Sequence, residues 1–173
     1  MHHPHADPVP GALAGHCVPD RGWFARLAAR PLLMCGFRPF FLATAVYGVL
    51  VVLAWTGFLG AGLALPRVAG GPFVWHAHEL MFGFGLAAVA GFVLTAVPEF
   101  TATPAFAPRL VLRLALLWLA ARVAYWLSGS LAALADVGAI GHLPAALLNA
   151  GFALAVCAVV APRLWHDREL FKA

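Results

Sequence analysis

The chain carries four long apolar stretches, and they constrain its fold more than any other feature. They cover residues 40–60, 78–97, 108–127 and 142–161, with glycine, proline and serine residues between them. Each is close to the roughly 20 residues that an α-helix needs to cross about 30 Å of hydrocarbon. Strands of a membrane β-barrel would be only about ten residues long and would alternate in polarity. The pattern therefore predicts an all-α, polytopic membrane protein with a bundle of four transmembrane helices.

The composition points to the same environment. Of the 173 residues, 10% are charged and 63% are hydrophobic, whereas a soluble domain has about 25% charged residues. So little polar surface cannot cover a water-soluble globule, and we expect a lipid bilayer around the chain. The eleven Lys and Arg residues stand singly, with no basic run. The charge pattern of a nucleic-acid-binding surface is missing, so no nucleic acid partner is expected.

The positive charges lie on one side of the predicted spans. Nine of the eleven Lys and Arg residues flank the spans in the N-terminal arm, the second loop and the C-terminal segment. On the other side there is one, Arg67. Positively charged loops stay on the cytoplasmic side of a membrane. Both termini are therefore predicted to be cytoplasmic.

The segments outside the bundle differ in character. Residues 1–20 are rich in Pro, Gly and His, which predicts a disordered cytoplasmic tail. Residues 21–35 alternate apolar side chains with arginines, which predicts a short amphipathic helix in the membrane interface. The bundle is expected over residues 36–161, and residues 162–173 form a second cytoplasmic tail.

The densest polar cluster, His76, His78 and Glu79, lies at the entry to the second span. The charge pattern places it at the outer membrane face, where Asp136 and His142 are also expected. Neutral imidazole binds haem iron and copper, and a nearby carboxylate can orient it. The cluster is a candidate metal or haem pocket, with His76, His78 and His142 as candidate ligands. The alternative is that these histidines only form hydrogen bonds to loop carbonyls or begin a helix.

Helical geometry restricts how this cluster can act. Residues two apart on a helix point about 200° apart, so His76 and His78 cannot bind one metal unless the helix begins between them. His76 and Glu79 share a face with Gly83, and Ala87 and Gly91 continue that face in steps of four. Such small residues let another helix approach closely. The face is therefore expected to point into the bundle.

Arg122 lies well inside the third span. It could pair with Glu79, hold a haem propionate, or extend to the outer interface. Trp118 and Trp126 lie one turn to either side of it, where they could stack on its guanidinium group.

Three charged residues are expected at the inner ends of the helices. An ion pair of Glu99 with Arg38 or Arg113 would join these ends, and we favour this structural role for all three.

Three blocks of sequence have a specific order and spacing: Gly36-Phe37-Arg38-Pro39-Phe40-Phe41-Leu42, Trp75-His76-Ala77-His78-Glu79-Leu80-Met81-Phe82-Gly83 and Ala90-Gly91-Phe92-Val93-Leu94-Thr95-Ala96-Val97-Pro98. These blocks resemble the NnrS family, polytopic proteins of the bacterial inner membrane that are associated with the response to nitric oxide. A stretch around Arg122 is similar too. The resemblance is clear over residues 31–127 and looser over the fourth span.

The resemblance implies haem and copper binding in the membrane and protection against nitrosative stress, with His76 and His78 as the leading ligand candidates and Glu79 and Arg122 beside the cofactor. Members of the family are usually longer, with further His and Arg motifs in later helices. A second copy or a partner chain would then supply the missing helices.

Two alternatives remain at this point. One is a structural or accessory module without a cofactor, and the other is a small oligomeric transporter that uses Glu79 and Arg122. No residue implies turnover of nitric oxide, so whether the protein is an enzyme stays open.

Overall fold

The computed structural model describes residues 23, 37–68, 70–130 and 141–170. The disordered tail predicted over residues 1–20 lies outside these residues. So do nearly all of the interfacial segment predicted over residues 21–35, and Asp136.

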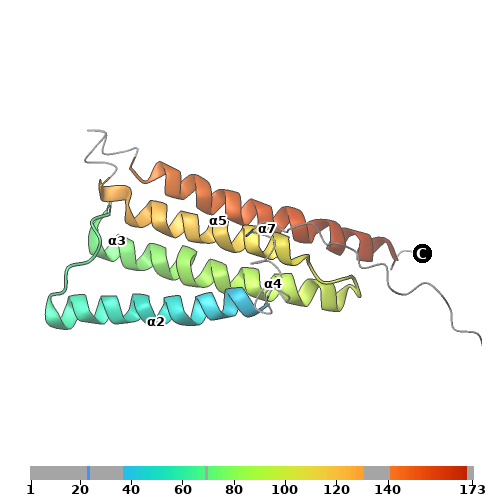
Figure 1. Cartoon of the computed structure of the whole chain (residues 1–173), viewed down its shortest axis with the longest axis horizontal. Helices are drawn as coiled ribbons and strands as arrows, with labels where there is room; N and C mark the ends of the chain where they lie inside the picture. The colour runs from blue at the N-terminus through green and yellow to red at the C-terminus, as the bar shows by residue number, and fades with distance from the viewer. Residues whose placement is uncertain (1–22, 24–36, 69, 131–140, 171–173) are drawn as a thin grey trace, which may run out of the picture.

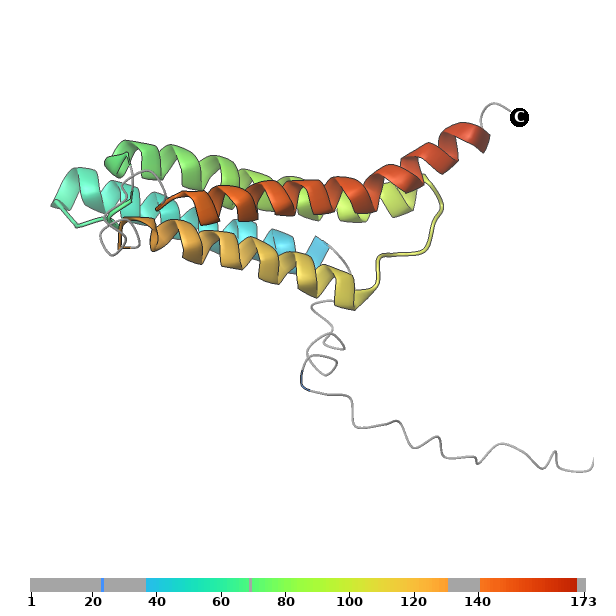
Figure 2. The ribbon, with the colours of Figure 1, turned by 90° about the horizontal axis from the view of Figure 1, so that it is seen from above.

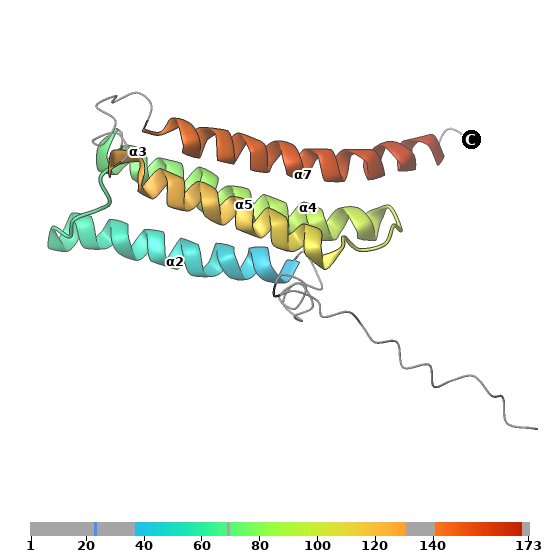
Figure 3. The ribbon, with the colours of Figure 1, turned by 45° about the horizontal axis from the view of Figure 1, so that its top comes forward.

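The described residues form a bundle of four helical rods that lie side by side, with consecutive rods antiparallel (Figure 1, Figure 3). The second rod is made of three segments joined end to end, α3, η2 and α4. The elements are α2 (Phe37–Ala61), α3 (Gly71–His78), η2 (Glu79–Gly85), α4 (Leu86–Phe100), α5 (Pro108–Trp126) and α7 (Leu143–Leu170).

The predicted fold class is confirmed, since the described elements are all helices and three of them are long and apolar enough to cross a membrane. These are Arg38–Ala61, Gly71–Phe100 and Leu143–Trp165. The third predicted span, 108–127, corresponds to α5, which is shorter and carries Arg109, Arg113 and Arg122 within nineteen residues. Four helical rods are present, but α5, with its three arginines, is not among those apolar enough to span a membrane, so four is an approximate number of spans.

The second rod begins seven residues earlier than the predicted span 78–97. Gly70 and Gly71 have φ values of 90° and 77°, a backbone conformation that glycine adopts without steric cost. Pro72 follows in the first turn, where its missing N–H would be unpaired in any case. The Gly-Gly-Pro sequence therefore starts the helix, and His76 and His78 both lie inside it.

The spans predicted to end at residues 97 and 161 both continue through the proline that follows. Pro98 is inside α4 and Pro162 is inside α7. A proline removes a single backbone hydrogen bond, and a helix held by its neighbours tolerates this loss. The end of α4 is closed by Thr101, whose backbone N–H and side-chain hydroxyl both donate to the Val97 carbonyl, at 2.9 Å and 2.7 Å. Beyond Pro162, α7 continues to Leu170 and extends away from the other helices (Figure 2).

Helix packing encloses two apolar clusters. Helix α2 packs against η2 and α4, and α5 packs against α7, which also contacts α4. The larger cluster includes Phe40, Leu94, Trp118 and Phe152. The smaller one contains Val51, Trp75, Tyr125 and Ala145. The polar side chains described next lie between α2, η2, α5 and α7.

Candidate functional site

Glu79 and Arg122 form an ion pair inside the bundle. Arg122 Nη1 lies 3.0 Å from Glu79 Oε2, and the two side chains are 3% and 0% exposed. Of the alternatives for Arg122, pairing with Glu79 is the one observed. Removing two charges from water is costly, so the pair is stable there only because further hydrogen bonds complete it.

Three other side chains form hydrogen bonds with the ion pair. Tyr47 of α2 donates its hydroxyl to Glu79 Oε2, and Arg122 Nη2 donates to the side-chain oxygen of Asn149 in α7. The other carboxylate oxygen of Glu79, Oε1, lies 3.1 Å from His78 Nδ1. The network therefore joins all four helical rods through buried hydrogen bonds.

The Glu79 carboxylate determines which nitrogen of His78 carries a proton. An ionised carboxylate only accepts hydrogen bonds, so His78 Nδ1 must be the donor. In the neutral ring, Nε2 then carries the lone pair, and it accepts a hydrogen bond of 3.4 Å from Asn149 Nδ2. A carboxylate that holds the N–H of one ring nitrogen, so that the other nitrogen carries the lone pair, is the arrangement usual for metal-binding histidines.

A π-helical segment, η2, shapes this part of the second rod. Its hydrogen bonds span five residues, as shown by the bond from the Leu86 N–H to the Met81 carbonyl. Such segments are frequent at functional sites. Trp118 Nε1 donates to the Gly83 carbonyl at 3.0 Å. Gly83 is buried, and a Cβ atom on it would collide with the Tyr47 ring and lie 2.8 Å from Glu79 Oε2.

The predicted small-residue face packs against α2. Gly83, Ala87 and Gly91 are all buried. A Cβ atom on Gly91 would lie 2.8 Å from the ring of Phe41 and 2.9 Å from Phe40 Cβ.

His76 and His78 are directed toward different helices. The ring of His76 stacks on Trp55 of α2, with ring centroids 4.2 Å apart. The ring of His78 stacks on Tyr125 of α5, at 3.5 Å. The helix begins before both residues, so the 200° separation applies. The structure therefore does not bring His76 together with His78 as ligands of one metal.

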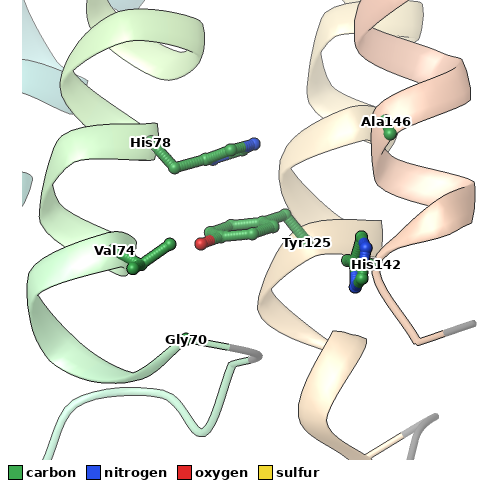
Figure 4. Close-up of a pocket in the computed structure, with 6 residues that line it drawn as sticks. All are labelled: Gly70, Val74, His78, Tyr125, His142 and Ala146. Carbon is green, nitrogen blue, oxygen red and sulfur yellow. The ribbon is translucent and has the colours of Figure 1, made fainter. Parts of the chain in front are cut away.

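His142 does share a cavity with His78. This cavity has a volume of about 370 Å³ and is lined by Gly70, Val74, His78, Tyr125, His142 and Ala146 (Figure 4). Two imidazoles thus line one cavity from α3 and from the start of α7. Within the part of the chain that the structure describes, no group of three or more His, Cys, Asp or Glu side chains is placed to hold a metal.

Other predicted contacts differ from the structure. Glu99 and Arg113 are both exposed. The ion pairs within the described residues are those of Glu79, so the predicted pair of Glu99 with Arg113 is not formed. Arg38 is also exposed. Trp118 and Trp126 do not stack on Arg122. Their indole N–H groups donate instead to Gly83 and to the Tyr47 hydroxyl, which are polar partners that a lone helix cannot reveal.

Tyr47, Tyr125 and Asn149 are central to the site, and sequence reasoning did not select them as site residues. The chain has only two tyrosines, and both contact the Glu79–His78 pair. A tyrosine is a rare polar residue in an apolar span, and this rarity could have marked both as site candidates. Asn149 carried a similar signal, as a polar residue inside the fourth span.

The fold and the site together define a class, a polytopic helical membrane protein with a charged network buried between its helices. A family model described as "NnrS protein" matches residues 31–172, most of the chain. The chain therefore belongs to the NnrS family, and the match includes the fourth helix. No curated protein and no solved structure matches it.

Proposed function

We propose that this chain acts in the response to nitric oxide and nitrosative stress as an NnrS-type protein of the bacterial inner membrane, and that it binds haem or copper through His78. Membership of the NnrS family supports the general role. The observation that carries the ligand assignment is the contact of 3.1 Å between His78 Nδ1 and Glu79 Oε1, which leaves the lone pair of the neutral ring on Nε2. A metal bound there would replace the hydrogen bond from Asn149 Nδ2.

The residues near His78 suit an imidazole-bound metal. His142 lines the same cavity and supplies a second neutral donor. Arg122 balances the charge of Glu79, so the carboxylate can orient His78 without an unpaired charge in the bundle. A bound haem or copper would supply a redox-active centre that coordinates nitric oxide. Two imidazoles are a partial ligand set, so we propose that a second copy or a partner chain contributes the remaining donors.

The test compares His78 with His76, a histidine of the same helix that faces another neighbour. We expect purified wild-type protein to show a haem absorption band or bound copper by metal analysis, and His78→Ala to lose it. His76→Ala is the matched control, since His76 stacks on Trp55 and does not line the cavity of His78. Metal retained in His78→Ala, or folded protein that takes up neither haem nor copper, would contradict the assignment.

A structural module without a cofactor is the second candidate. It is favoured by the bonds around Glu79, whose two oxygens are both bonded to side chains of the bundle. If the network serves only to join helices, His78→Ala lowers thermal stability, and neither wild-type nor variant protein binds a metal.

A further inference from the structure

A groove runs along one face of α7, between this helix and the second rod. It consists of two cavities that share His78 and Ala146, and we call them together the outer groove. The first is the cavity of about 370 Å³ that contains His142. The second has about 360 Å³ and is lined by His78, Phe82, Leu86, Asn149 and alanines of α7. Each volume lies within the range of small-molecule sites.

The first cavity has a polar group without a partner. Tyr125 is 4% exposed, and its hydroxyl makes no hydrogen bond within the described part of the chain. In Figure 4 this hydroxyl points toward Val74, and His142 lies on the opposite wall. A buried hydroxyl without a partner is costly. Less than 1 Å² of this oxygen is accessible, so a ligand oxygen would satisfy it by displacing the Val74 side chain, and His142 could donate to a second oxygen.

The lack of positive charge in the lining of the outer groove indicates which kind of oxygen-containing ligand it can bind. No lysine or arginine is among the described residues that line it. The nearest buried cation, Arg122, is bonded to Glu79 and Asn149. A phosphate or carboxylate headgroup would therefore enter without a countercharge, which is unfavourable in an apolar site. Neutral carbonyl oxygens carry no such cost.

The shape and the apolar lining of the outer groove indicate what the rest of the ligand is like. The stacked rings of His78 and Tyr125 present an aromatic wall in the first cavity. The second cavity continues along Phe82, Leu86, Ala150 and Ala153, which are apolar. A flat ring with carbonyl groups would fit the first cavity, and a hydrocarbon tail would fit the second.

We propose that the outer groove binds a lipid-soluble quinone, with its ring in the first cavity beside Tyr125 and His142 and its isoprenoid tail along α7. This site goes beyond the proposed metal site and requires no metal on His78. It shares the first cavity with that site, so a quinone ring and a metal held by both His78 and His142 would exclude each other there.

The test measures binding of decylubiquinone to the purified full-length chain in detergent by isothermal titration calorimetry. Ala146→Phe places a large ring where the two cavities meet, and we expect binding at least about tenfold weaker. Tyr125→Phe keeps the aromatic wall and removes one hydrogen bond, and we expect binding about fivefold weaker. Ala158→Phe is the matched control, on an exposed position of α7 that does not line the groove, and should bind as the wild type does.

Decanol has the same tail length without the ring, and it should not displace decylubiquinone. Absence of quinone binding, equal binding by wild type, Ala146→Phe and Tyr125→Phe, or full displacement by decanol would overturn the proposal. If Ala146→Phe does not fold, Tyr125→Phe decides. Metal analysis of each sample keeps the two proposals separate, because quinone binding by metal-free protein supports the groove whatever the fate of the metal site.

Discussion

At the scale of single residues, Glu79 shows how a helical bundle can hold a charge. Its carboxylate accepts hydrogen bonds from Tyr47 and Arg122 and contacts His78. Each of these partners comes from a position that is itself held by packing, since Arg122 is 3% exposed and Tyr47 meets the edge of Trp118. Loss of Arg122 would therefore leave the Glu79 charge buried and unbalanced, whereas loss of Tyr47 would remove one hydrogen bond from the carboxylate.

We expect Arg122→Met to destabilise the protein by about 3–5 kcal/mol, because it leaves Glu79 buried without its cation. Adding Glu79→Gln should restore much of the loss, since the charge is then removed as well. Thermal unfolding in detergent measures both effects. Arg113→Met is the control, because Arg113 is exposed on the same helix and should change stability by less than about 0.5 kcal/mol. A double variant as unstable as Arg122→Met alone would contradict the coupling.

At the scale of elements, η2 brings together groups that a regular helix would separate. Its wider turn places Gly83 under the Tyr47 ring and beside Glu79 Oε2. The Gly83 carbonyl accepts a hydrogen bond from the indole N–H of Trp118 in α5. The absence of a side chain at Gly83 is thus what allows α2 to approach the second rod at the height of the ion pair.

Gly83→Ala should lower the free energy of unfolding by about 1–3 kcal/mol, because the added methyl group collides with Tyr47 and crowds the Glu79 carboxylate. Gly151→Ala tests the same change in a helix where a Cβ atom would meet nothing within 4 Å, and it should be neutral or slightly stabilising. Thermal unfolding of both variants checks this pair. Equal effects would mean that helix propensity decides the result and that packing at Gly83 does not.

At the scale of the whole molecule, the polar network is confined to one part of the bundle. The buried polar side chains among the described residues are those of Thr44, Glu79, Arg122, Ser128 and Asn149, and Thr44, one turn from Phe40, donates to a carbonyl of its own helix. Within the described residues, the polar side chains around Glu79 therefore do not continue through the length of the bundle. A transporter would have to form its path between copies of the chain, and the network gives that alternative no direct support.

The positive residues indicate the orientation of the bundle. Arg38 begins α2, Arg109 and Arg113 begin α5, and Arg163 lies near the end of α7. The antiparallel course of the rods brings these positions to the same end, while Arg67 follows α2 at the opposite end (Figure 3). We propose that the end with Arg38 faces the cytoplasm and that the candidate site lies toward the periplasm.

This orientation predicts the activity of reporter fusions in bacteria. Green fluorescent protein fused behind the last residue should fluoresce, because it folds in the cytoplasm. Alkaline phosphatase fused behind Arg67 should be active, because it requires the periplasm. The same phosphatase fused behind Ala107, before α5, is the control and should be inactive. The reverse pattern would refute both the orientation and a periplasmic location of the site.

The sequence alone determined that the chain is a helical membrane protein and where its helices lie, to within several residues. Runs of about 20 apolar residues have few other ways to satisfy their backbone in lipid, and this constraint needs no knowledge of neighbours. The pairing of Arg122 with Glu79 was one of few options for a charge in a span, and it could also be anticipated.

Only the tertiary structure decided how the polar residues are combined. Tyr47 and Asn149 reach Glu79 and Arg122 from helices that are distant in sequence, and His76 and His78 separate because the helix already begins at Gly71. In the π-helical segment, Gly83 meets Tyr47 and Trp118, which come from two other helices. Apolar periodicity places a helix in the membrane, but packing between helices determines which side chains meet.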